Sequence, residues 1–444
     1  MIKWRTATKA SAFRLAAYYG AAAFLFPAAA GATKLDLSSN VEIRAGNYEH
    51  LPYGNASVSQ PIYSENASLG FVIKGIQLEK TENSSMDVGI VLQSIGPGAS
   101  SNTITSPQFT DAASRLPESN GTPYIHSAYV RIYKFLHPNI TATFGRQDFV
   151  LGQGITLAGG DLGLPGGRLE IANIFRSVKA DLFVFRPFNA GRFYKIYGAT
   201  AYYPGNEGLW QAYHFWERND AAAQDITFNA FSETKKFTGL RYFLTQKQLS
   251  FDGEAVIERG TAKKIGSGTG NFEGHAFMMK GAWNQNVAFF GQSRIRLAYG
   301  RSSGDSGSDS SSDKAFFPTF GNNYSGLERK GYGAIAGASL YDIIKTSDTQ
   351  NGLPHGVSGL NVIDIGADLP YKKLLLAADL YKFRASRNST GGSLQIASEW
   401  DLKATYPMGD NLNFTAVYAV FTPLSLYPAA TASKLAYGSI SAKF

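Results

Sequence analysis

The sequence of 444 residues contains no cysteine, and this absence excludes several classes of protein at once. A disulfide-stabilised scaffold, a thiolate zinc site, an iron–sulfur cluster and a cysteine nucleophile all require that residue. Charged residues are also scarce, at 17% of the chain. After residue 32, no stretch of the sequence reaches the ~18 consecutive apolar residues that indicate a membrane-spanning helix. If the chain contacts a membrane, we therefore expect the contact to come from another kind of fold.

The first 32 residues differ from the rest because they hold four basic residues and no acidic one. An apolar stretch follows at 15–26, and Ala30-Gly31-Ala32 matches the small-residue pattern of a signal-peptidase site. The alternative is a retained membrane anchor. Against it, the apolar stretch is shorter than the ~20 residues that span a bilayer, and Pro27 interrupts it. We expect residues 1–32 to be a cleaved signal peptide.

The remaining segment, 33–444, carries 38 Lys and Arg against 34 Asp and Glu, a net charge of only +4. Nucleic-acid-binding proteins usually carry a clustered basic surface, so this balance argues against a nucleic-acid partner.

Apolar and polar residues alternate through most of 33–444. Between residues 34 and 45, one parity holds Leu35, Leu37, Val41 and Ile43, and the other holds Asp36, Glu42 and Arg44. Successive side chains of a β-strand point to opposite faces, so this segment has one apolar and one polar face. The same alternation recurs at 249–258, 399–406 and 412–420. Many segments of about ten residues separated by Gly, Asn, Ser and Pro turns predict an all-β fold.

Two all-β architectures fit this pattern. A soluble sandwich or propeller buries its apolar faces against a second layer, whereas a transmembrane barrel presents them to lipid around a wet interior. Consecutive charges on the polar faces, aromatic residues at segment ends such as Tyr48 and Tyr133, and the C-terminal Phe444 on the apolar parity of the last segment favour the barrel. A C-terminal aromatic residue resembles the signal by which the barrel assembly machinery recognises bacterial outer-membrane proteins.

The candidate strands number 18 or 19, depending on whether residues 168–175 form one. Closed bacterial barrels have an even number of strands, so we predict a membrane-spanning antiparallel β-barrel of about 18 strands over 33–444. The expected alternation of short turns and long loops fails at two places. The long connections Ser302–Arg329 and Gly260–Phe272 fall at the end of the barrel where short turns are expected. For Gly145–Arg168, the glycine content argues against a strand, and we expect a loop that folds inward.

Three stretches resemble the alginate export family of outer-membrane barrels. They are Phe144-Gly145-Arg146-Gln147, the loop 317–326, and the hairpin from Glu399-Trp400-Asp401 to Tyr418-Ala419-Val420-Phe421. The resemblance implies an 18-stranded barrel whose arginine-bearing lumen passes an anionic polysaccharide, with periplasmic polysaccharide-export components as partners. A general or substrate-specific diffusion porin for small solutes is the alternative function.

Charged residues on the polar parity are the candidates for lining a pore, because fixed charges set ion preference and arginine binds carboxylates through its planar fork. A competing interpretation is that they pair with neighbouring acids and only stabilise the wall. Arg146 shares the parity of Phe144 and would point inward only if Gly145 formed a bulge. The candidates are Arg44, Arg131, Arg146, Lys179, Lys195, Arg241, Arg294, Arg296, Lys403, Asp252, Glu254, Glu399 and Asp401.

Enzymatic motifs are weak throughout the sequence. The six histidines lack the spacing of a metal site, and no Gly-x-Ser-x-Gly elbow occurs. Gly304-Asp305-Ser306-Gly307 imitates a protease signature inside a Ser/Gly/Asp-rich stretch. We therefore expect no catalytic residue, metal or cofactor, and a channel surrounded by outer-membrane lipid. The alternatives from other classes are a hydrolase at the barrel rim and a non-conducting surface adhesin.

Overall fold

The computed structural model describes most of the chain after residue 32, so the expected signal peptide lies outside the described residues. No helix among the residues described is long and apolar enough to cross a membrane. The described residues are 33–53, 56–78, 84–96, 121–160, 163–175, 177–189, 192–219, 223–224, 229–264, 268–309, 311–319, 324–325, 328–344, 346, 349, 351–427 and 430–444.

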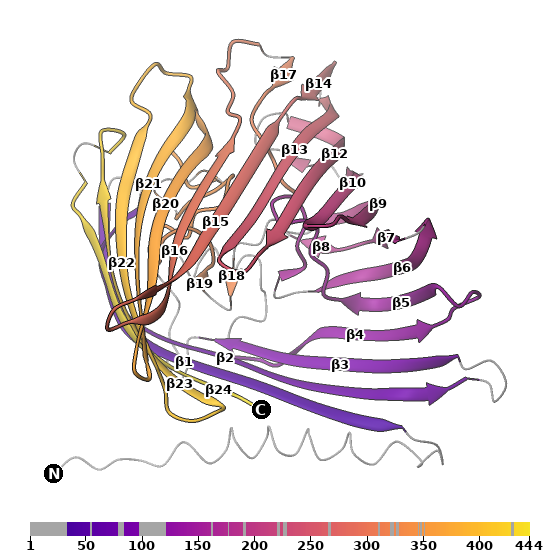
Figure 1. Ribbon diagram of the computed structural model, residues 1–444. Helices are drawn as coiled ribbons and strands as arrows, with labels where there is room; N and C mark the ends of the chain where they lie inside the picture. Colours follow the sequence, from indigo (N-terminus) through magenta and orange to yellow (C-terminus); the bar gives the residue numbers. More distant parts are fainter. Residues whose placement is uncertain are drawn as a thin grey trace.

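Eighteen long antiparallel strands form a closed barrel, as the sequence predicts. Each strand pairs with the next along the chain, and the last pairs with the first from Asn40↔Lys443 to Glu49↔Lys434. Figure 1 shows this closure, with the indigo and yellow strands side by side. The wall strands are β1 (Lys34–Tyr53), β2 (Ala56–Gln77), β3 (Ser85–Gly96), β4 (Tyr124–Tyr133), β5 (Ile140–Gln147), β6 (Leu164–Phe175), β7 (Val178–Phe185), β9 (Arg192–Pro204), β10 (Gly208–Asn219), β12 (Asn229–Thr245), β13 (Leu249–Lys264), β15 (His275–Val287), β16 (Gly291–Ser302), β20 (Val357–Tyr371), β21 (Leu374–Asn388), β22 (Gln395–Pro407), β23 (Leu412–Pro423) and β24 (Ser433–Lys443).

Short turns and long loops alternate between the two ends of the barrel. The end that carries the start of β1 and the end of β24 has turns such as 205–207, 246–248 and 372–373. The other end carries the long connections, of which 303–356 is the longest. Residues 164–175 form a full strand, β6, and with it in place both connections that did not fit fall at the long-loop end. Short strands within the loops are β8 (Phe188–Asn189), β11 (Ala223–Gln224), β14 (Thr269–Phe272), β17 (Ser312–Asp313), β18 (Tyr324–Ser325) and β19 (Glu328–Arg329).

The apolar parity of the strands faces outward, as the alternation predicts. Leu37, Val184 and Leu297 are 61%, 62% and 56% exposed, because none of the described residues covers this surface. An outward apolar band of this kind is where a transmembrane barrel contacts lipid. Phe444 also points outward, and its backbone exchanges two hydrogen bonds of 2.9 Å with Ser39 across the closure.

Position along the strand should decide how well this outward face tolerates charge. Leu297 lies in the middle of β16, and Leu249 begins β13 at the short-turn end. We expect Leu297→Arg to destabilise the barrel by about 2–4 kcal/mol, because arginine would enter the lipid midplane. Leu249→Arg, the matched control, should cost no more than about 1 kcal/mol near the interface. Equilibrium unfolding in liposomes measures both, and equal losses would contradict the lipid-facing assignment.

Two loops fold into the lumen near the long-loop end. Residues 148–163 place Leu151, Ile155 and Leu157 in a buried cluster with the inward Phe183 and Phe215 of the wall. This confirms the inward loop predicted for Gly145–Arg168. The prediction is wrong for the two ends of that range, which belong to β5 and β6.

Gly166 lies within β6, at a point where this strand passes very close to the neighbouring strand β7. A side-chain carbon at Gly166 would lie 2.0 Å from the backbone oxygen of Val184. Only a residue without a side chain permits this approach, so the glycine belongs to the strand rather than to the loop.

The second inward loop is the long connection 303–356. Its Ile335, Ala336, Ile343 and Ile344 are buried in a cluster with wall residues that include Phe383. The interior therefore differs from a purely polar lumen, because buried apolar clusters lie in it beside buried charged residues.

Candidate functional site

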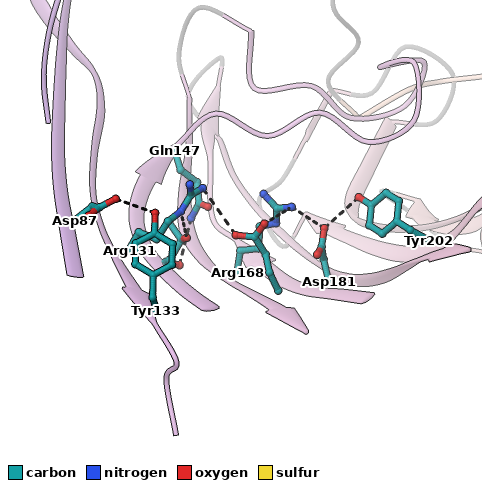
Figure 2. A network of polar contacts seen from close by, with 9 residues as sticks. Asp87, Arg131, Tyr133, Gln147, Arg168, Asp181 and Tyr202 are labelled. Atoms are coloured by element: carbon teal, nitrogen blue, oxygen red, sulfur yellow. Dashed lines mark hydrogen bonds and ion pairs between the residues drawn. The ribbon is translucent and has the colours of Figure 1, made fainter. Parts of the chain in front are cut away.

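A band of polar side chains crosses the inner wall of β3 to β9 (Figure 2). At one side, the Tyr133 hydroxyl donates a hydrogen bond of 2.8 Å to Asp87. The neighbouring Arg131 donates to the Thr143 hydroxyl at 3.2 Å and lies 3.8 Å from a Glu170 carboxylate oxygen. The band therefore links adjacent strands through alternating acceptors and donors.

Arg168 continues this band toward β9. Its guanidinium lies 2.7 Å from Asp181 and 3.1 Å from Glu170, and the Tyr202 hydroxyl donates to Asp181 at 3.1 Å. Lys179 lines the same cavity of about 500 Å³ together with these groups. Both signs of charge are present, so this part of the wall presents a wet, mixed surface rather than a single-sign ladder.

Arg296 is the centre of a second inward cluster. Its guanidinium lies 3.0 Å from Asp368 and 2.9 Å from Asp379, which belong to two different strands. Gly366 stands between them, and a side chain there would overlap Asp379. The missing side chain lets Arg296 reach across β20, so both carboxylates share one cation.

Arg241 and Glu254 connect the wall to the loop 148–163. Arg241 forms two parallel hydrogen bonds of 2.7 Å with Asp252 and donates a third to the carbonyl of Gly152, also at 2.7 Å. Glu254 is buried and accepts hydrogen bonds of 2.5 Å from the Gln153 amide and the Tyr213 hydroxyl. These contacts hold the loop at a fixed height in the lumen.

Glu399 and Asp401 hold the loop 303–356 in the same way. The amides of Ile335 and Ala336 donate to Glu399 at 2.7 and 3.0 Å, and the amide of Ala334 donates to Asp401 at 2.8 Å. Both carboxylates are buried, so their main contacts are with the loop rather than with the solvent of the pore.

The two loops approach one another beside Lys280. A cavity of about 250 Å³ lies between them, and its lining includes Gln153, Lys280, Lys330, Tyr332 and Tyr341. The Lys280 ammonium lies 5.9 Å from the centre of the Tyr332 ring. No carboxylate is found among the described residues that line this cavity. We call it the constriction cavity.

Tyr332 remains a neutral donor at this position. Burial raises the pKa of its hydroxyl well above the usual range, and the negative charges of Asp364 and Asp252 add to the effect. The hydroxyl donates to the sulfur of Met278 at 2.9 Å. The constriction cavity therefore places two cations beside a neutral phenol, and the two cations suit an anion.

Sequence reasoning missed both lysines of the constriction cavity. Lys280 follows Ala276 and Met278 on the inward parity of β15, and these apolar neighbours hide the usual alternation. Lys330 lies in the loop 303–356, where no periodic pattern applies. Only the parity of β15 offered a signal in the sequence, and it concerned Lys280 alone.

Most of the thirteen predicted pore-lining residues lie on the inward parity, and their role in the pore stays a prediction. Arg44, for example, is bound to Glu42 at 2.9 Å. The inward residues are Arg44, Arg131, Lys179, Arg241, Arg294, Arg296, Lys403, Asp252, Glu254, Glu399 and Asp401.

Arg146 and Lys195 differ from that expectation, because the strand register places them outward. Gly145 has a φ of 113°, yet the pairing continues from Phe144 through Arg146 without a bulge. Lys195 is exposed and precedes Ile196, which is fully buried on the inward face.

Comparison with known proteins shows the fold. The described residues hold no group of His, Cys, Asp and Glu that could bind a metal ion. No protein-family model matches the chain, and the search among curated proteins found no match. The similarity to solved structures extends over nearly the whole chain, and it shows the fold of a membrane-spanning β-barrel.

The similar structures are porins. OccK9 (OpdG) of Pseudomonas aeruginosa matches with a TM-score of 0.58 at 12% identity, over 93% of this chain and 98% of that one. OccK2 (OpdF) of the same organism, solved in complex with glucuronate, has a TM-score of 0.55 at 12% identity, over 92% and 98%. OpdK of that organism, solved with vanillate, has a TM-score of 0.53 at 9% identity, over 92% and 98%.

Proposed function

We propose that the chain is a passive diffusion channel of the bacterial outer membrane for small anionic solutes. The constriction cavity carries this proposal: Lys280 and Lys330 face a narrow space whose described lining contains no carboxylate. Rings or pairs of fixed cations favour the passage of anions. Two of the similar porins were solved with glucuronate and vanillate, and both compounds are small carboxylates.

The fixed positions of the two inward loops favour small solutes over a polymer. Both inward loops have buried apolar cores, and wall carboxylates hold their backbone amides. A polysaccharide of the alginate type would have to pass the same constriction, which requires these loops to move together. The alginate-export interpretation of the sequence is therefore the weaker of the two.

Planar-bilayer recording of the purified full chain tests this function. We expect small, discrete conductance steps that prefer anions, and a current that millimolar glucuronate reduces. Alginate oligomers should leave the current unchanged because they cannot enter the constriction. A large unselective conductance, a block by alginate oligomers, or no current at all would contradict the proposal; the last result would favour an adhesin.

A further inference from the structure

The outer surface carries a row of basic residues at the long-loop end of five neighbouring strands. Arg146 on β5 pairs with Pro165 on β6, and the amide of Arg186, just after β7, donates to the Pro165 carbonyl at 2.8 Å. Lys195 on β9 pairs directly with Arg218 on β10. We call Arg146, Arg186, Lys195 and Arg218 the basic row.

The basic row faces away from the lumen. Arg186, Lys195 and Arg218 are exposed, and their sequence neighbours Phe185, Ile196 and Glu217 are buried on the inner face. Arg146 and Arg218 each lie one residue from the end of their strand. At this height a transmembrane strand leaves the hydrocarbon and meets the lipid head groups.

The like charges of the basic row lie close together. Side chains directly opposite on antiparallel strands are ~5 Å apart, and like charges in such positions repel. Lys195 and Arg218 form one such pair, and Lys236 and Arg259 form another on the adjoining strands β12 and β13. An anion placed between these side chains would contact cations from neighbouring strands.

An apolar row lies directly beneath the basic row. Register pairs Phe144 with Gly167, Gly167 with Val184, Val184 with Tyr197, and Tyr197 with Trp216. On each strand, the residue of the apolar row lies two positions from the residue at the height of the basic row. The two rows are therefore about 7 Å apart.

These apolar residues surround a hollow of about 770 Å³ in the outer wall. Gly167 leaves room for the hollow, because the nearest atoms to a side-chain carbon there would be those of the Phe144 ring, at 3.4 to 3.6 Å. Tyr197 and Trp216 close one side as a stacked pair with centroids 5.4 Å apart. The outward side chains that line the hollow are apolar apart from Arg186 of the basic row, so the charged end and the apolar space adjoin.

We propose that the basic row and this hollow form a binding site for a phosphorylated membrane lipid. The phosphate lies on Arg146, Arg186, Lys195 and Arg218, and one acyl chain fills the hollow over Gly167. Arginine suits phosphate because its planar fork donates two parallel hydrogen bonds. The site faces the membrane, opposite to the lumen, and is independent of the proposed channel function.

Native mass spectrometry of the full chain in detergent tests the site with synthetic bisphosphorylated lipid A as the probe. The same glycolipid without its phosphates serves as the second probe. We expect a bound adduct with the phosphorylated probe, and at least tenfold weaker binding by the quadruple variant R146Q/R186Q/K195Q/R218Q. The control K247Q/K373Q removes two lysines from turns at the opposite end and should bind as the unmodified chain does.

The acyl-chain half of the site has its own variant. Gly167→Leu fills the hollow without changing charge, and we expect at least threefold weaker binding of the phosphorylated probe. The proposal is overturned if the quadruple variant binds as tightly as the unmodified chain, if the dephosphorylated probe binds equally well, or if the basic row instead supports dimers. Conductance in neutral-lipid bilayers should be the same for all these variants, so failure of this site and failure of the channel function are distinguishable.

Discussion

Replacing Glu399 and Asp401 together by alanine is expected to raise the single-channel conductance several-fold and to make the open current noisy. These carboxylates accept the amides of Ala334, Ile335 and Ala336, which fix the loop 303–356 inside the lumen. Leaving a buried backbone donor without its acceptor costs about 1–3 kcal/mol. Without the acceptors, two buried amides and one half-buried amide lose their partners, and the loop gains access to conformations outside the lumen.

Asp36→Asn provides the matched control for this conductance experiment. Asp36 is also an inward wall carboxylate, but it pairs with the side chains of Lys34 and Lys74 at the short-turn end. Planar-bilayer recordings of the control should match those of the unmodified chain. If the E399A/D401A double variant conducts with the same amplitude and noise, the loop does not limit the current and the role given to its anchors is incorrect.

The sequence predicted the wall of this barrel well because lipid imposes a strict rule on it. Every second residue of a wall strand faces lipid, as Leu35 and Leu37 do, so the outward parity can be recognised in the sequence by its apolar residues. The even strand number follows from closure by antiparallel pairing, which needs the first and last strands to run in opposite directions, and Phe444 marked the last strand. These features depend on neighbours in the sequence or on a general constraint, and both are available without a structure.

The interior was harder to predict because it is only partly wet. Around Lys195 both parities are apolar or aromatic: Ile196 packs inside against the loop 148–163, and Tyr197 faces lipid. The alternation therefore no longer distinguishes the two faces, and Lys195 was assigned to the wrong face. Arg146 kept its outward parity because Gly145 forms no bulge.

The anchors of the loops illustrate a second limit. Glu399 was correctly predicted to point inward, yet its partners Ile335 and Ala336 lie more than sixty residues away in a loop without periodicity. Charge and parity identify an inward carboxylate, but they do not tell whether a loop amide or the solvent meets it. That information exists only in the folded chain.

Reversing the charges at the constriction cavity should reverse the ion preference of the channel. The double variant K280E/K330E exchanges two cations for two anions in a cavity of about 250 Å³. Two unit charges ~10 Å apart interact by about 1.7 kcal/mol at an effective dielectric constant of ~20, and ~1.4 kcal/mol corresponds to a tenfold change. We therefore expect the anion-to-cation permeability ratio to fall at least tenfold, so that cations become the preferred ions.

Reversal potentials in a salt gradient measure this ratio directly. The control K247E/K373E makes the same charge change in two turns at the short-turn end, where screening by salt over ~10 Å weakens its effect on ions in the constriction. An equal shift in both double variants would mean that the overall charge of the barrel, rather than the two lysines between the loops, sets the selectivity. A shift confined to K280E/K330E places the selective step at the cavity where the two inward loops meet.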